Sequence, residues 1–114
     1  MARTVSLIIT VLNEERTIGP LLDSLLAQTR PPDEVVICDA GSRDRTRAII
    51  NDYMARGLKA RVLVEPGANR SRARNLAIRE ASGEVIASTD GGCVADVEWL
   101  ARLTAPFEEQ TPPE

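Results

Sequence analysis

Small polar and acidic residues follow each of four short apolar stretches in this 114-residue chain. They form the segments Asn13-Glu14-Glu15, Asp39-Ala40-Gly41-Ser42, Glu65-Pro66-Gly67-Ala68-Asn69-Arg70 and Asp90-Gly91-Gly92. Carboxylate oxygens are ligands for Mg²⁺ and Mn²⁺, and an arginine beside the start of a helix favours phosphate. These residue types indicate a site for a divalent cation, a phosphorylated ligand or both.

The apolar pattern of the chain alternates between strands and helices. Four apolar stretches predict buried strands, at residues 4–11, 34–38, 61–64 and 85–88. Apolar residues recur with helical spacing over residues 17–26, 44–57, 71–81 and 96–105, with Asp44 as a helix cap and Gly83 as a C-cap. Four βα units in series predict an α/β fold, a parallel sheet with helices on both faces. Because ligands bind at the carboxyl ends of such strands, the four polar segments are expected at one edge of the sheet.

The composition excludes several other function classes. The chain has no histidine, which removes His-based catalytic triads and the usual zinc sites. A net charge of −3 and only three aromatic residues argue against nucleic acid as a partner. The sequence contains neither GxGxxG nor GxxxxGK[ST], so no dinucleotide fold and no P-loop is indicated. Two cysteines without a CxxC pair, and no secretory signal ahead of them, predict a reducing, cytoplasmic location.

Each polar segment also has a purely structural interpretation, and the residues alone leave both open. Asp39 could close a turn with Gly41 and Ser42 instead of binding a ligand. Asp90 precedes two glycines that allow close approach to the backbone, which favours a cation or phosphate contact over a simple turn. The three arginines of residues 70–74 fit either a solvated helix face or an anion-binding helix start.

Taken together, these segments resemble the N-terminal half of a family 2 glycosyltransferase with the GT-A fold. The matching parts are residues 5–46, the Ala-Arg-Asn of residues 73–75 with Gly-Glu at 83–84, and residues 88–100. The resemblance implies a Rossmann-like, mostly parallel sheet that stops after about four βα units. It makes residues 1–107 an incomplete donor-binding domain and residues 108–114 a polar tail.

The resemblance also implies an activity, the transfer of a sugar from a nucleotide-diphosphate donor to an acceptor hydroxyl. In the family, the first strand's loop and the aspartate after the second strand hold the nucleoside, and an arginine-bearing segment lines the donor pocket. An aspartate of the family's DxD motif contacts the ribose or the metal. Carried over, the donor-binding residues are Thr10, Leu12, Asn13, Glu14, Asp39, Gly41, Ser42, Arg70, Arg74 and Asp90. Asp39 is expected to contact the base, and Asp90 to bind the Mg²⁺ or Mn²⁺ that offsets charge on the departing diphosphate.

Three features depart from the family pattern. Gly92 replaces the second DxD carboxylate, so weak metal binding is expected, and the nearest spare carboxylate, Asp96, is expected to start the next helix. Ala40 replaces an acid that is paired with the preceding aspartate in the family. The family's general base and acceptor site lie in a later half, so the catalytic residue, and any membrane attachment of a longer protein, is expected beyond residue 114. The incomplete sheet is expected to expose apolar surface and to favour self-association.

Two alternatives stand beside a transferase. A non-catalytic nucleotide-binding module fits the missing carboxylate at Gly92. A receiver-like signalling domain shares the fold class, but it needs a lysine after its last strand, and the only lysine, Lys59, is predicted at the opposite edge. The acceptor, whether saccharide, lipid or small molecule, is left open.

Overall fold

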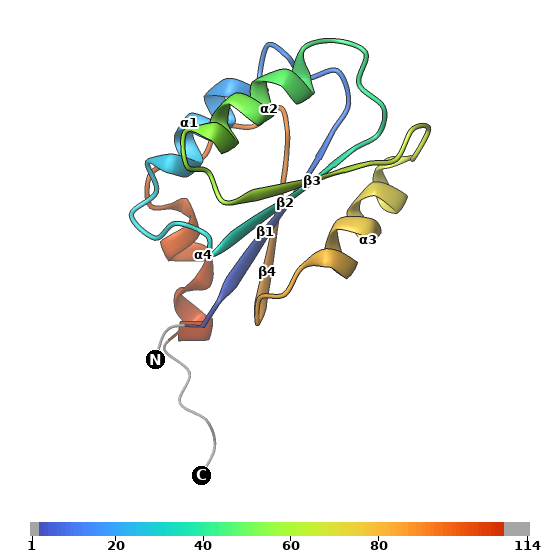
Figure 1. Cartoon of the computed structure of the whole chain (residues 1–114). Helices are drawn as coiled ribbons and strands as arrows, with labels where there is room; N and C mark the ends of the chain where they lie inside the picture. The colour runs from blue at the N-terminus through green and yellow to red at the C-terminus, as the bar shows by residue number, and fades with distance from the viewer. Residues whose placement is uncertain (1–2, 109–114) are drawn as a thin grey trace.

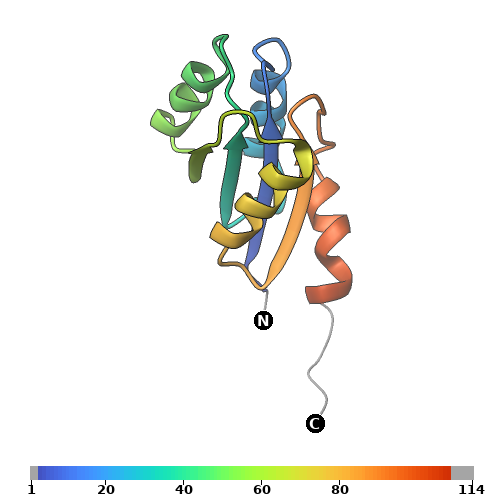
Figure 2. The ribbon, with the colours of Figure 1, turned by 90° about the vertical axis from the view of Figure 1, so that its right-hand side faces the viewer.

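The computed structural model describes residues 3–108, which form four strands and four helices in strict alternation. The elements are β1 (Val5–Val11), α1 (Ile18–Leu26), β2 (Glu34–Asp39), α2 (Thr46–Ala55), β3 (Ala60–Val64), α3 (Arg70–Glu80), β4 (Val85–Asp90) and α4 (Trp99–Glu108). The strands form one parallel sheet in the order β3-β2-β1-β4. Helices α1, α2 and α4 cover one face and α3 covers the other (Figures 1 and 2). The predicted α/β fold with helices on both faces is confirmed.

The central strand β1 is apolar along almost its whole length because both of its faces are covered. Val5, Leu7 and Ile9 belong to the larger core, which also contains the buried side chains of α1, α2 and α4. Ile8 belongs to the smaller core, where Ala73 of α3 packs against the sheet. A strand that is buried on both faces has no face exposed to solvent. Its sequence therefore does not alternate between apolar and polar residues.

The register of the sheet brings the ends of its strands together. Val11 pairs with Asp39 across β1 and β2, and Thr10 pairs with Asp90 across β1 and β4. The residues that follow these strands therefore begin side by side, at the same edge of the sheet. The arrangement agrees with the general position of ligand sites in open α/β sheets.

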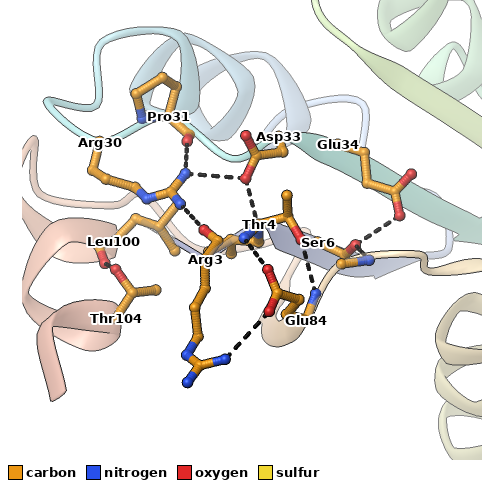
Figure 3. Close-up of polar contacts among 12 residues, drawn as sticks. Arg3, Thr4, Ser6, Arg30, Pro31, Asp33, Glu34, Glu84, Leu100 and Thr104 are labelled. Atoms are coloured by element: carbon orange, nitrogen blue, oxygen red, sulfur yellow. Dashed lines mark hydrogen bonds and ion pairs between the residues drawn. The ribbon is translucent and has the colours of Figure 1, made fainter. Parts of the chain in front are cut away.

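The opposite, amino-terminal edge of the sheet is occupied by polar side chains that bond to one another (Figure 3). The Val5 N–H donates to Asp33 Oδ2 at 2.6 Å, and the Ser6 hydroxyl donates to Glu34 Oε1 at 2.6 Å. Arg3 and Glu84 form an ion pair at 3.2 Å. These contacts join the starts of β1, β2 and β4 and leave the carboxyl edge as the place for a ligand.

The prediction that Gly83 caps α3 is wrong. The C-cap of α3 is Ala81, and Gly83 lies two residues later. A Cβ on Gly83 would meet the backbone N of Ser6 at 2.6 Å, so the glycine is needed where the turn between α3 and β4 approaches β1 closely.

Helix boundaries differ by a few residues from those expected. The first residue of α4 is Trp99, three residues after the predicted start at Asp96. The last is Glu108, one residue past the predicted end of the domain, and the rest of the predicted tail, residues 109–114, lies outside the described residues. Asp44 precedes the N-cap Arg45 of α2, and its Oδ1 accepts a hydrogen bond from the Thr46 N–H at 2.9 Å. Of the helices in residues 3–108, none has the length and apolar character needed to cross a bilayer.

Candidate functional site

A cavity of about 240 Å³ opens at the carboxyl ends of β1 and β4, beside the start of α3. Its walls come from the last residues of β1 and β4, the segments that follow β1, β2 and β3, and the start of α3. They are formed by Thr10, Val11, Leu12, Glu14, Ala40, Ala68, Asn69, Arg70, Ala73 and Asp90. Five of the predicted donor-binding residues thus meet in one cavity: Thr10, Leu12, Glu14, Arg70 and Asp90.

The basic wall of this cavity is the first turn of α3. Asn69 is the N-cap, and its Oδ1 accepts a hydrogen bond from the Arg72 N–H at 2.8 Å. Arg70 follows as the first residue of the helix and lines the cavity. Backbone N–H groups and the positive end of the helix dipole favour an anion at this position, and the guanidinium adds a full charge.

The acidic wall is formed by Asp90 and Glu14. Asp90 ends β4 and is exposed, while the Thr17 hydroxyl donates to Glu14 Oε2 at 2.8 Å. Residues 3–108 hold no group of three or more acidic or cysteine side chains suited to a metal ion. Two carboxylates without a protein cage still fit Mg²⁺, which is commonly held by one or two carboxylates together with the phosphates of its ligand.

The two glycines after Asp90 have different surroundings. A Cβ on Gly91 would lie 2.8 Å from Val11 Cγ1, so this buried position admits no side chain without a shift. At Gly92 the nearest atom to a Cβ would be Glu14 Oε2, at 3.9 Å. Position 92, where the resemblance leads us to expect a second carboxylate, is therefore open and faces Glu14. Asp96 does not line the cavity, and its Oδ1 accepts from the Glu98 N–H at 2.9 Å in the turn before α4.

Asp39 is buried and does not line the cavity, although the next residue, Ala40, does. Its Oδ1 accepts hydrogen bonds from the Gly41 N–H at 3.0 Å, the Ser42 N–H at 2.8 Å and the Ser42 hydroxyl at 2.8 Å. The buried Oδ2 lies 3.2 Å from Arg47 Nε and accepts no hydrogen bond from any residue of the described chain. Oδ1 thus closes a turn, as the structural interpretation of Asp39 expected. Contact between Asp39 and the base of a nucleotide stays a prediction, and it would involve Oδ2.

The remaining predicted residues do not line the cavity. Asn13 borders a neighbouring shallow hollow, and Gly41 and Ser42 belong to the Asp39 turn. Arg74 is exposed on the second turn of α3. Sequence reasoning missed Asn69 as a wall residue, although an asparagine directly before an arginine-rich helix is a recognisable N-cap signal.

The two cysteines of the chain have opposite environments near this edge of the sheet. Cys38 is buried in the smaller core, one residue before Asp39, and burial raises the pKa of its thiol, as do the nearby charges of Glu65 and Asp39. Cys93 is exposed, three residues after Asp90, and its N–H donates to the Asp90 carbonyl at 3.2 Å.

Comparison with known proteins identifies relatives of one enzyme family. The family model described as Glycosyl transferase family 2 matches residues 6–112. The uncharacterized glycosyltransferase EpsJ of Bacillus subtilis is 34% identical over 109 residues, which are 96% of this chain and 32% of EpsJ.

Solved structures of two transferases share the fold. Staphylococcus aureus TarS 1-349 in complex with UDP-GlcNAc superposes with a TM-score of 0.84 at 30% identity, over 93% of this chain and 31% of that chain. The mannosyltransferase PcManGT of Pyrobaculum calidifontis, in complex with GDP-Man and Mn²⁺, has a TM-score of 0.78 at 28% identity, over 89% and 33%. The chain thus spans about one third of the length of these relatives. Because the family model matches residues 6–112, nearly the whole chain, the chain belongs to glycosyltransferase family 2.

Proposed function

We propose that this chain is the donor-binding part of a glycosyltransferase that transfers a sugar from a nucleotide diphosphate to an acceptor hydroxyl. The observation that carries the proposal is the cavity in which Arg70, Asp90 and Glu14 converge at the carboxyl edge of the sheet. The complexes of TarS with UDP-GlcNAc and of PcManGT with GDP-Man and Mn²⁺ support a ligand of this class. Family membership makes a receiver-like domain the weaker alternative, and Lys59 directly precedes β3, at the amino edge.

Two walls of the cavity would bind different parts of the donor. One wall would hold the nucleoside, because it combines apolar contact with hydrogen-bonding oxygens. It consists of Thr10, Leu12 and the turn that begins at Asp39. Arg70 and the first turn of α3 would hold the diphosphate by charge and by backbone N–H groups. Asn13, Gly41, Ser42 and Arg74 would act around the rim.

A divalent cation is the proposed cofactor. Asp90 would hold Mg²⁺ or Mn²⁺, and the cation would supply positive charge against the negative charge that develops on the leaving group. Because Gly92 supplies no second carboxylate, we propose that the cation binds weakly unless the nucleotide is present. The general base and the acceptor site are proposed to lie outside these 114 residues, and a cytoplasmic location is proposed for the donor site.

Calorimetric titration of the chain with UDP, GDP and ADP, each with and without Mn²⁺, tests the proposal. We expect saturable binding of one nucleotide. Asp39→Ala is expected to weaken that binding with or without metal, and Asp90→Ala to remove its dependence on Mn²⁺. Arg79→Ala is a matched control, because Arg79 is an exposed residue in the last turn of α3 and does not line the cavity.

Two results would contradict the proposal. Absence of nucleotide binding by the folded chain would argue against a donor site within it. Unchanged affinity in both aspartate variants would reject the assignment of the site while leaving nucleotide binding itself intact.

A further inference from the structure

Three consecutive backbone N–H groups of the β1–α1 loop, those of residues 13–15, all donate to side chains of the β2–α2 segment. The acceptors are Ser42 Oγ for Asn13 at 2.9 Å, Thr46 Oγ1 for Glu14 at 2.8 Å and Asp44 Oδ2 for Glu15 at 3.2 Å. The three side chains occur at every second position, 42, 44 and 46. We call these three residues the loop clamp.

Both hydroxyls of the loop clamp are oriented by carboxylates. The Ser42 hydroxyl donates to Asp39 Oδ1 at 2.8 Å, and the Thr46 hydroxyl donates to Asp44 Oδ1 at 2.5 Å. A hydroxyl has one hydrogen to donate, so each is left with its lone pairs facing the loop N–H. Each hydroxyl thus connects a loop amide to a carboxylate in a defined direction.

The two hydroxyls of the loop clamp are buried. Ser42 is 3% exposed and Thr46 is 0% exposed, so water does not replace these hydroxyls readily. Removing a buried acceptor leaves the partner N–H unsatisfied, which costs more free energy than the bond itself contributes. Desolvation alone would raise the pKa of Asp44, but hydrogen bonds from Thr46 and Glu15 outweigh it and hold that pKa below the usual value.

The loop clamp also determines what the β1–α1 loop can offer a ligand. Asn13 has φ of +52°, a left-handed conformation, and its Oδ1 accepts a return bond from the Arg43 N–H at 2.9 Å. The N–H groups of residues 13–15 already donate to the loop clamp, so these three groups do not contribute to binding phosphate. What the loop presents to the cavity is Leu12 and the side chain of Glu14.

We infer that Thr46 and Asp44 are positioning residues, which hold the β1–α1 loop in the conformation that forms one wall of the donor cavity. Neither residue lines that cavity, so their effect on the donor is exerted through the loop. The inference rests on the proposed function for its ligand. It assigns to the β2–α2 segment a role in nucleotide affinity beyond the contacts of Asp39.

The test compares Thr46→Val, which removes the hydroxyl at nearly constant volume, with Thr46→Ser, which keeps it. Thr104→Val is the matched control. Thr104 is also 0% exposed, and its hydroxyl donates to the Leu100 carbonyl at 2.8 Å inside α4 (Figure 3). Thr104 does not line the cavity. We expect Thr46→Val to weaken binding of the nucleotide that the wild-type chain prefers by about ten-fold, because the binding-competent loop becomes a minor conformation. Thr46→Ser and Thr104→Val should bind within about two-fold of wild type, although Thr104→Val loses thermal stability.

A second readout needs no ligand. Amide hydrogen exchange of Glu14 in the free chain should accelerate in Thr46→Val and not in Thr104→Val. Wild-type affinity in Thr46→Val, or equal weakening in Thr104→Val, would overturn the inference. If no nucleotide binds the wild-type chain, the proposed function fails, and exchange alone decides whether Thr46 holds the loop. Unchanged protection of Glu14 in Thr46→Val would then overturn the loop clamp as well.

Discussion

At the scale of single residues, the neighbours Gly91 and Gly92 differ in what they allow. Val11 lies against Gly91, so even a methyl group there would displace the β1 side chain. Gly92 has open space in front of Glu14. A carboxylate can therefore be added at position 92 but not at position 91 without disturbing the sheet.

We expect Gly92→Asp to strengthen Mn²⁺-dependent binding of UDP or of the nucleotide that the chain prefers. A third carboxylate near Asp90 and Glu14 would give the cation another anionic oxygen ligand, and affinity rises with such ligands. The measurement is a titration with nucleotide at several Mn²⁺ concentrations. Gly92→Asn is the control, since it adds similar volume without the charge. Equal behaviour of the two variants would show that the missing carboxylate does not limit metal affinity.

Predicting the site from sequence succeeded for residues at the carboxyl end of a strand or in the segment that leads from it to the next helix. Asp90, Glu14 and Arg70 could be placed at one edge because the carboxyl ends of parallel strands meet there. Asp39 also lies at the end of a strand, but its side chain turns inward, where it accepts hydrogen bonds from Gly41 and Ser42 and forms an ion pair with Arg47. Which way a side chain points after a strand depends on the packing of the adjacent loop, which periodicity does not report.

At the scale of elements, the amino ends of β1 and β2 are joined through Glu34. Its Oε1 accepts from the hydroxyl of Ser6 at 2.6 Å and from the N–H of Ser82 at 2.6 Å. These hydrogen bonds, of which the one from Ser6 has the largest effect, lower the pKa of Glu34 below its usual 4.5. They outweigh the partial desolvation of the carboxylate, which would raise the pKa. The carboxylate form of Glu34 is therefore favoured by folding.

This lowered pKa gives a testable dependence of stability on pH. Because the folded pKa is below the unfolded one, the contribution of Glu34 is present above pH 4.5 and is lost as the pH falls through the folded pKa. Glu34→Gln should be less stable than wild type to urea at pH 7, and the difference should shrink as the pH is lowered below 4.5. Glu98→Gln is the control, because Glu98 is exposed and its ion pair is with Arg102 at 3.0 Å, away from Glu34. A difference that stays constant with pH would contradict this role of Glu34.

Strands and helices could be predicted from the sequence where they are determined by residues close together in the chain. The apolar runs of the strands and the helical spacing of apolar residues identified all eight. The use of Gly83 could not be identified, because the backbone that it approaches belongs to Ser6, 77 positions earlier. The loop clamp could not be predicted from the sequence either, because its partners are also far apart in the chain. The hydroxyls at positions 42 and 46 reach residues 13 and 14 only because Val11 pairs with Asp39.

At the scale of the whole molecule, β4 is the last strand on its side of the sheet within residues 3–108. Ile86 in β4 is 43% exposed, and Leu103 and Phe107 of α4 are exposed as well. An unpaired strand edge with apolar side chains is a template for pairing with another strand. We therefore propose that the 114-residue chain associates with itself at this edge.

Sedimentation velocity over a range of protein concentrations tests this association. We expect the wild-type chain to form larger species as its concentration rises, and Ile86→Lys to shift the distribution toward the monomer. Ile78→Lys, on the exposed side of α3, is the control for an added charge elsewhere on the surface. A monomer at every concentration, or an equal effect of the two variants, would reject the β4 edge as the contact.

The contrast between the two thiols has a practical consequence. Thiolates react with maleimides and thiols do not, so the buried Cys38, with its raised pKa, is protected both by access and by protonation. Cys93 is open to reagent, and it lies three residues from Asp90. A fluorophore can therefore be attached next to the acidic wall of the cavity without altering the sequence, and its emission would report the arrival of metal and nucleotide in real time.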